Sequence, residues 1–195
     1  MKFNINMLAY SMLVALLSAT SSSYAVESKV STLLYISPNY YHYSVHLLHP
    51  YYDYWFEQGP LVEPIALKAL KEKNGELGLC KANETADIVI RIKPNLFYNP
   101  QLRVYHSKLV ATVFSGGGNV LGTYVGEAQQ QGSNSVDTGI TKSLNKVYTL
   151  AMQDLMTKLQ TNALADSTKT NNANTENKLP CGLIGTQMET QINFY

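Results

Sequence analysis

The chain has 195 residues, of which 45% are hydrophobic, with 15 basic and 14 acidic side chains and a formal net charge of +1. This length suits one domain that is large enough to bury a core. A near-neutral chain without a basic block has no field to attract nucleic acid, so we expect no nucleic-acid partner.

The first 25 residues have the pattern of an export signal. An apolar run over residues 7–19 follows Lys2, and Ser23 and Ala25 supply the small residues that precede a cleavage site. The run is shorter than the roughly 20 continuous apolar residues that span a bilayer. We therefore expect a signal peptide over residues 1–25 and no transmembrane span in the mature chain. The expected location is the bacterial periplasm or, otherwise, the extracellular space.

The next two segments are a short apolar run and an aromatic stretch. Residues 29–37 are β-branched and apolar, and they predict a strand that ends at a proline. Residues 39–56 contain three of the four histidines and six of the fourteen tyrosines. On a helix, the spacing of His42, His46 and His49 would place all three within about 60° of one another. Three imidazoles can hold zinc and leave a fourth position open.

Three interpretations of residues 39–56 stay open at this stage. The first is the zinc site, which would serve a secreted metal-dependent hydrolase. The second is a partly solvated edge of the core, where aromatic side chains bury their rings and expose their polar ends to water. The third is a contact surface, because Tyr and Trp are enriched at binding interfaces. That surface would consist of Tyr41, Tyr43, Tyr51, Tyr52, Tyr54 and Trp55.

A helix and a strand are predicted further along the chain. Residues 59–75 predict a helix, with prolines near its first turn and a glycine that can take the left-handed conformation at its end. Residues 86–94 alternate, with Ile88, Ile90 and Ile92 on one face. This alternation predicts a strand with one buried face that ends at Pro94.

Two β-rich runs, residues 102–114 and 120–130, flank a glycine-rich loop and predict a hairpin. From Asp137, apolar residues recur every three or four positions and predict an amphipathic helix. We therefore expect an α+β domain over residues 26–164. Its antiparallel-rich sheet of about four strands would carry two helices on one face, in the order strand, helix, strand, strand, strand, helix.

The remaining segments suggest a linker and a tail that returns to the domain. Residues 165–178 lack large apolar side chains, so we expect a disordered linker. Residues 179–195 are apolar again. Cys80 and Cys181 are the two cysteines, and an even number in an exported chain favours a disulfide. Such a bond would dock the tail against the domain.

The layout of residues 86–160 is similar to that of bacterial cell-envelope accessory proteins. The shared pattern is an alanine-aspartate pair, a strand, a hairpin with a glycine turn and a long C-terminal helix. It resembles the auxiliary components of lipid transporters and the domains related to the curli-secretion lipoprotein. The resemblance implies a non-enzymatic adaptor in the periplasm, and it assigns no functional residue.

These observations predict an exported binding or adaptor protein that uses the aromatic stretch to contact another envelope protein or a small envelope ligand. We expect no cofactor and no catalytic set. The alternatives are the metal-dependent hydrolase with a zinc site at His42, His46 and His49, and a structural protein without an assigned partner.

Overall fold

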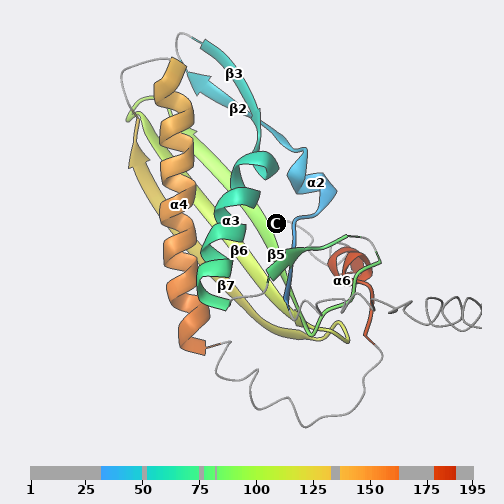
Figure 1. Ribbon diagram of the computed structural model, residues 1–195. Coiled ribbons are helices and arrows are strands. Elements are labelled where there is room, and N and C mark those ends of the chain that lie inside the picture. Colours follow the sequence, from blue (N-terminus) through green and yellow to red (C-terminus); the bar gives the residue numbers. More distant parts are fainter. Residues whose placement is uncertain are drawn as a thin grey trace, which may run out of the picture.

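The computed structural model describes residues 32–49, 52–74, 77–81, 83–132, 137–162 and 178–187 (Figure 1). The predicted signal peptide and residues 165–177 of the predicted linker lie outside these ranges. The elements in chain order are β1 (Thr32–Tyr35), α2 (Pro38–Tyr41), β2 (Ser44–His49), β3 (Tyr52–Glu57), α3 (Gln58–Asn74), β4 (Leu77–Leu79), β5 (Ile88–Asn99), β6 (Val104–Ser115), β7 (Val120–Gln131), α4 (Asp137–Asn162) and α6 (Cys181–Gln187).

The predicted α+β class is confirmed, but the sheet differs from the expected one. It has five strands in the order β4-β1-β5-β6-β7. The strands β4, β1 and β5 run parallel, whereas β5, β6 and β7 run antiparallel, so the sheet is mixed. The additional strand β4 has three residues, too few for a visible alternation. The strands β2 and β3 form a separate two-stranded hairpin.

Strand β5 continues through Pro94, which corrects the expectation that this proline ends it. β1 pairs with β5 only over Ile88–Arg91. Pro94 therefore lies where β5 pairs with β6 alone among the described strands. A proline is tolerated where a strand has an open side, because its missing N–H breaks no ladder bond there.

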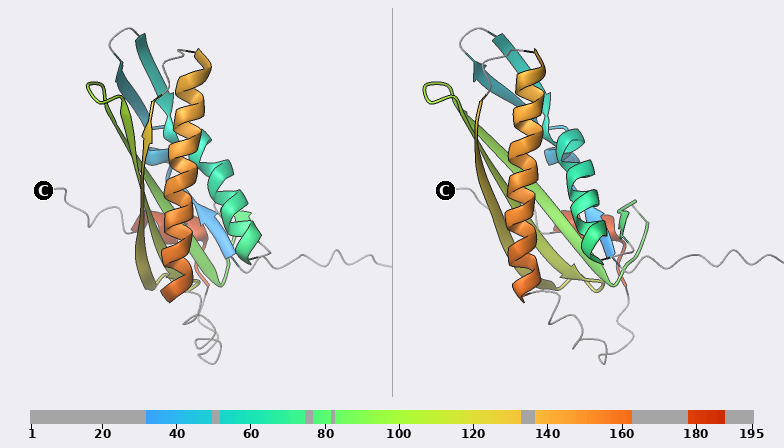
Figure 2. Two further views of the ribbon diagram at one scale, coloured as in Figure 1. Left: turned by 90° about the vertical axis from the view of Figure 1, so that its left-hand side faces the viewer. Right: turned by 60° about the vertical axis from the view of Figure 1, so that its left-hand side comes forward.

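The helices α3 and α4 cover one face of the sheet and enclose the larger core (Figure 2). α4 carries the predicted apolar positions, and all of them are buried: Ile140, Leu144, Val147, Ala151, Leu155 and Leu159. The helix packs closely on β7. A Cβ atom added at Gly126 would lie 2.2 Å from the carbonyl oxygen of Ala151, so this position requires glycine.

The short helix α6 covers the opposite face and encloses a second core of Leu33, Ala86, Val89, Phe114, Cys181 and Ile184. Val89 and Arg91 are therefore buried together with Ile90 and Ile92 of β5, which corrects the expectation of one buried face. The guanidinium of Arg91 stacks on the Phe114 ring at 5.3 Å and donates a hydrogen bond to the carbonyl oxygen of Gly185.

The predicted disulfide between Cys80 and Cys181 is present, with the two Cα atoms 5.9 Å apart. Backbone hydrogen bonds from Leu179 to Gly116 and from Cys181 to Glu84 add to the attachment of α6. Among the described helices, none is long and apolar enough to cross a membrane.

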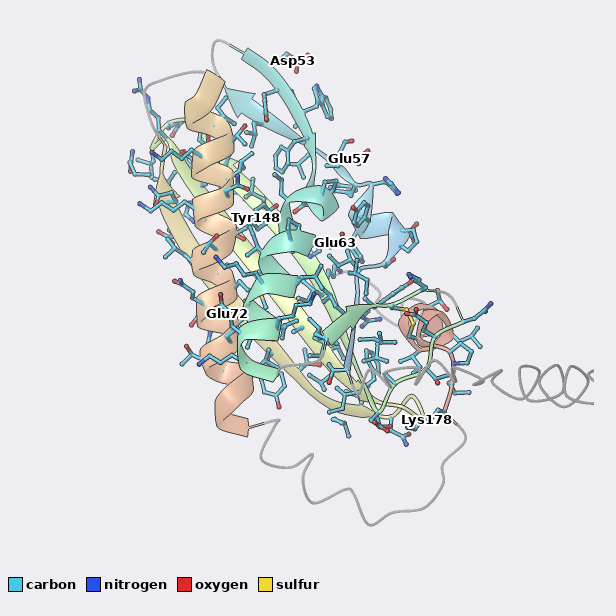
Figure 3. All side chains as sticks on the ribbon, in the orientation of Figure 1. Asp53, Glu57, Glu63, Glu72, Tyr148 and Lys178 are labelled. Carbon is cyan, nitrogen blue, oxygen red and sulfur yellow. A yellow bond between two sulfur atoms is a disulfide. The ribbon has the colours of Figure 1, made fainter. Side chains whose placement is uncertain are left out.

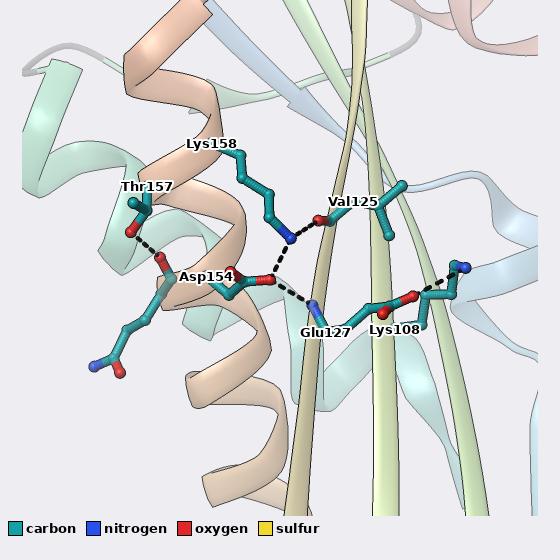
Figure 4. A network of polar contacts seen from close by, with 7 residues as sticks. Lys108, Val125, Glu127, Asp154, Thr157 and Lys158 are labelled. Carbon is teal, nitrogen blue, oxygen red and sulfur yellow. Dashed lines mark hydrogen bonds and ion pairs between the residues drawn. The ribbon is translucent and has the colours of Figure 1, made fainter.

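Side chains of α4 occupy the free edge of β7 (Figure 4). Asp154 Oδ2 accepts a hydrogen bond from the backbone N–H of Glu127 at 2.9 Å. Lys158 Nζ donates to the carbonyl oxygen of Val125 and to Asp154, both at 2.7 Å. The hydrogen bonds from Lys158 and from Glu127 lower the pKa of the Asp154 carboxyl. This pair blocks backbone groups that could otherwise pair with another strand.

We expect removal of the disulfide to destabilise the protein without changing the core behind α4. A loop of about 100 residues corresponds to an upper limit of about 4.7 kcal/mol in the chain-entropy model, and about 2–4 kcal/mol is typical. In urea titrations, the free energy of unfolding of the double variant Cys80→Ser/Cys181→Ser should be lower than that of the natural protein by an amount in that range. The reduced natural protein should match it, and an unchanged unfolding midpoint would contradict this prediction.

We expect the double variant Asp154→Ala/Lys158→Ala to expose the edge of β7 and to self-associate. The measurement is the molar mass from light scattering over a series of protein concentrations. The control Gln153→Ala/Thr157→Ala changes the same helix at neighbouring positions and should stay at the mass of the natural protein. Equal masses for both variants would show that the edge is protected by other means.

Candidate functional site

The hairpin of β2 and β3 divides the aromatic stretch into an inner face and an outer face. Its register pairs Val45 with Phe56, His46 with Trp55, and Leu47 with Tyr54. Side chains alternate between the two faces along each strand, so successive pairs of residues point to opposite faces of the hairpin. The inner face packs against the larger core with Val45, Leu47, Tyr54 and Phe56. The Tyr54 hydroxyl lies 3.5 Å from the hydroxyl of Thr141 on α4.

The outer face of the hairpin presents an ordered tryptophan to the solvent. Trp55 is 58% exposed. Its indole stacks on the His46 ring, with the centroids 4.3 Å apart and the planes 6° from parallel. The indole N–H donates to Asp53 Oδ1 at 2.9 Å, and His46 Nε2 lies 2.8 Å from the same oxygen. Three side chains thus hold one another in place on an exposed surface.

The same outer face continues toward the other end of the hairpin. His42 Nδ1 lies 3.4 Å from Glu57 Oε2. Tyr43, between the two elements α2 and β2, is 58% exposed. Asp53 and Glu57 thus each pair with a histidine. We call His42, Tyr43, His46, Asp53, Trp55 and Glu57 the hairpin surface.

Two other tyrosines of the predicted contact surface, Tyr41 and Tyr54, lie outside the hairpin surface. Tyr41 packs against the first turn of α3, where a Cβ added at Gly59 would lie 2.5 Å from the Tyr41 ring. Tyr54 points to the core. Tyr51 and the side chain of Tyr52 lie outside the described residues. The predicted surface is therefore a mixture of core residues and surface residues. Of the four predicted residues whose side chains the structure describes, Tyr43 and Trp55 are exposed.

The predicted zinc site stays untested, because the side chain of His49 lies outside the described residues. The helical arrangement that would gather the three histidines is absent, since His46 and His49 belong to β2. Within the described part of the chain, no three His, Cys, Asp or Glu side chains are placed to hold a metal ion.

A buried hydrogen bond anchors the base of the hairpin. Gln58 follows β3 directly as the first residue of α3, and it is 2% exposed. Its side-chain oxygen accepts a hydrogen bond from the hydroxyl of Tyr148 on α4 at 2.9 Å. Burial raises the pKa of the Tyr148 hydroxyl, so it remains a donor at physiological pH. Figure 3 shows Tyr148 on α4 between the helices. The sequence does not predict this pair, because nothing in the local pattern links two residues so far apart.

Two hollows lie outside the hairpin surface. One, of about 790 Å³, lies between β1, β4 and α6 beside the disulfide, and Leu79, Leu183 and Asn83 contribute to its lining. The other, of about 560 Å³, lies on the sheet over β5, β6 and β7, where Phe97 and His106 meet. Neither hollow contains a buried charge or a group of residues with an evident chemical role.

Solved structures resemble this chain, whereas no family model and no curated protein matches it. Protein XCC0632 from Xanthomonas campestris, which bears the family description DUF330, is 13% identical, with a TM-score of 0.50 over 72% of this chain and 89% of its own. This chain therefore shares the fold of that protein. A candidate lipoprotein from Caulobacter crescentus is 10% identical, with a TM-score of 0.40 over 68% and 89% of the two chains. A PelC variant from Paraburkholderia phytofirmans, described as a dodecamer, is 12% identical, with a TM-score of 0.38 over 64% and 87%.

We expect Tyr148→Phe to destabilise the protein by about 1–3 kcal/mol, because the buried oxygen of Gln58 loses its donor. Urea unfolding measures this loss. The double variant Tyr148→Phe/Gln58→Met removes both polar groups and should recover part of the stability. A double variant less stable than Tyr148→Phe alone would show that the hydrogen bond is not the reason for the loss.

Proposed function

We propose that this protein is a non-enzymatic binding or adaptor protein of the bacterial cell envelope, and that it captures another envelope protein through the hairpin surface. The observation that carries the proposal is Trp55. Its ring is largely exposed and yet held in one orientation by His46 and Asp53. Trp and Tyr in such positions dominate the binding energy of many interfaces.

The ordering of Trp55 before binding supports a contact role more than a purely structural one. A partner that immobilises a flexible side chain loses about 0.5–1.5 kcal/mol for each one. Stacking on His46 and the hydrogen bond to Asp53 remove much of this loss beforehand. The inner face of the hairpin already supplies the packing that holds β2 and β3 to the core. The outer face therefore adds little to folding, and its aromatic rings are available to a partner.

Placement in the envelope is supported by the disulfide. Disulfides persist in oxidising compartments such as the bacterial periplasm and are rare in the cytosol. The Cys80–Cys181 bond joins segments 101 residues apart and attaches α6 to the sheet. It is consistent with the export signal expected from residues 1–25 and with the resemblance of residues 86–160 to envelope accessory proteins.

We expect Trp55→Ala to weaken capture of the partner by about 2 kcal/mol, which is about 30-fold in the dissociation constant. The partner is first identified in the producing cell by a photo-crosslinking residue at position 43, and the affinity of the purified pair is then measured. Because Trp55 is on the surface, the free energy of unfolding should change by less than about 1 kcal/mol.

Phe97→Ala is the matched control, since Phe97 is an aromatic residue with 60% exposure on β5 and is not part of the hairpin surface. It should leave the affinity unchanged. Equal losses for both variants, or unfolding of the Trp55 variant, would argue against the hairpin surface as the contact site.

A further inference from the structure

We infer that the partner presents arginine side chains to the hairpin surface, where a guanidinium stacks on Trp55 and pairs with the carboxylate of Asp53 or of Glu57. This inference rests on the proposed function and adds the chemistry of the partner to it. It is carried by the arrangement of the charges and of the exposed ring along β3.

The strand β3 alternates acid, tryptophan and acid on its outer face. Asp53, Trp55 and Glu57 are spaced by two residues, so they share one face of the strand. Figure 3 shows Asp53 near the tip of the hairpin and Glu57 at its base, away from α4. One face of the indole stacks on His46, and the two acidic residues flank Trp55 along the strand.

The sequence places no positive side chain in the hairpin to balance these charges. Between Lys29 and Lys68 there is no lysine or arginine, whereas Asp53, Glu57 and Glu63 lie in that interval. His42 and His46 contact the carboxylates but carry a charge only when protonated. Lys93 Nζ lies 4.7 Å from the centre of the Tyr40 ring, which belongs to α2 and not to the hairpin. The hairpin surface is therefore aromatic and acidic, and it complements a cationic group.

An arginine fits this surface better than a lysine does. A guanidinium is planar, stacks on aromatic faces and can use both of its edges for carboxylates. Attraction between a cation and an exposed indole contributes about 0.5–1 kcal/mol. Each exposed ion pair adds about 0.2–1 kcal/mol. Several such contacts made by one side chain give a specific contact, although each alone is weak.

The fluorescence of Trp55 provides a direct test, because Trp55 is the only tryptophan of the chain. The full-length exported protein is titrated with a peptide of four arginines separated by glycines. We expect a saturable change of the fluorescence that weakens with added salt. A peptide with citrulline in place of arginine has the same shape without the charge and should give no saturable change. The lysine peptide should bind more weakly than the arginine peptide.

The variant Asp53→Asn/Glu57→Gln removes both charges and keeps an oxygen that can accept the hydrogen bond of the indole. It should weaken binding of the arginine peptide about 2- to 30-fold, as expected for two exposed ion pairs. The control Glu72→Gln/Glu127→Gln removes the same charge from α3 and β7 and should change the affinity less than about twofold. Equal affinities for the natural protein and the hairpin variant would overturn the inference.

The same hairpin variant separates this inference from the proposed function. If Trp55→Ala abolishes capture of the crosslinked partner while Asp53→Asn/Glu57→Gln captures it normally, the contact site stands and the cationic partner is overturned. If the arginine peptide binds but Trp55→Ala captures the partner normally, the proposed function fails instead. Binding of phosphatidylcholine vesicles without binding of the arginine peptide would assign the surface to a lipid headgroup and overturn the inference.

Discussion

The close packing of α4 on β7 is the constraint on which the rest of the structure depends. At Gly126 the backbone of the helix leaves no room for a Cβ atom, so helix and strand approach as closely as two backbones can. This approach places Asp154 and Lys158 beside the edge of β7 and aligns the apolar side of α4 with the sheet. From the same helix, Tyr148 reaches Gln58 and Thr141 reaches Tyr54. The position of the hairpin therefore follows from the position of α4.

The two faces of the sheet are stabilised by different means. The face under α3 and α4 buries a large continuous core, for which apolar packing is sufficient. The opposite face is covered by α6, a helix of seven residues with few side chains to bury. So short a helix is marginal by itself. The disulfide and the contacts of Arg91 with Phe114 and Gly185 compensate, because they restrict α6 to one place on the sheet.

The sequence predicted the elements whose signal is local. The apolar spacing of α4, the glycine turn between β6 and β7, and the even pair of cysteines each depend on residues whose pattern is visible without the fold. The missed features depend on distant partners. β4 becomes a strand only because β1 lies beside it, and Pro94 is accepted because β1 ends before it. Val89 and Arg91 look like surface positions until α6 covers them.

The candidate site shows the same division. Composition indicated that residues 39–56 were unusual, but it could not separate the aromatic rings that serve the core from those that face the solvent. That separation required the register of β2 and β3, which places Tyr54 and Phe56 inward and Trp55 outward. A strand shifted by one residue would exchange the two sets. The hydrogen bond between Gln58 and Tyr148 and the contact of Tyr54 with α4 fix the register of the two strands. The core therefore determines which aromatic ring faces the solvent. A change in the buried anchor would thus alter the hairpin surface although no residue of that surface had changed.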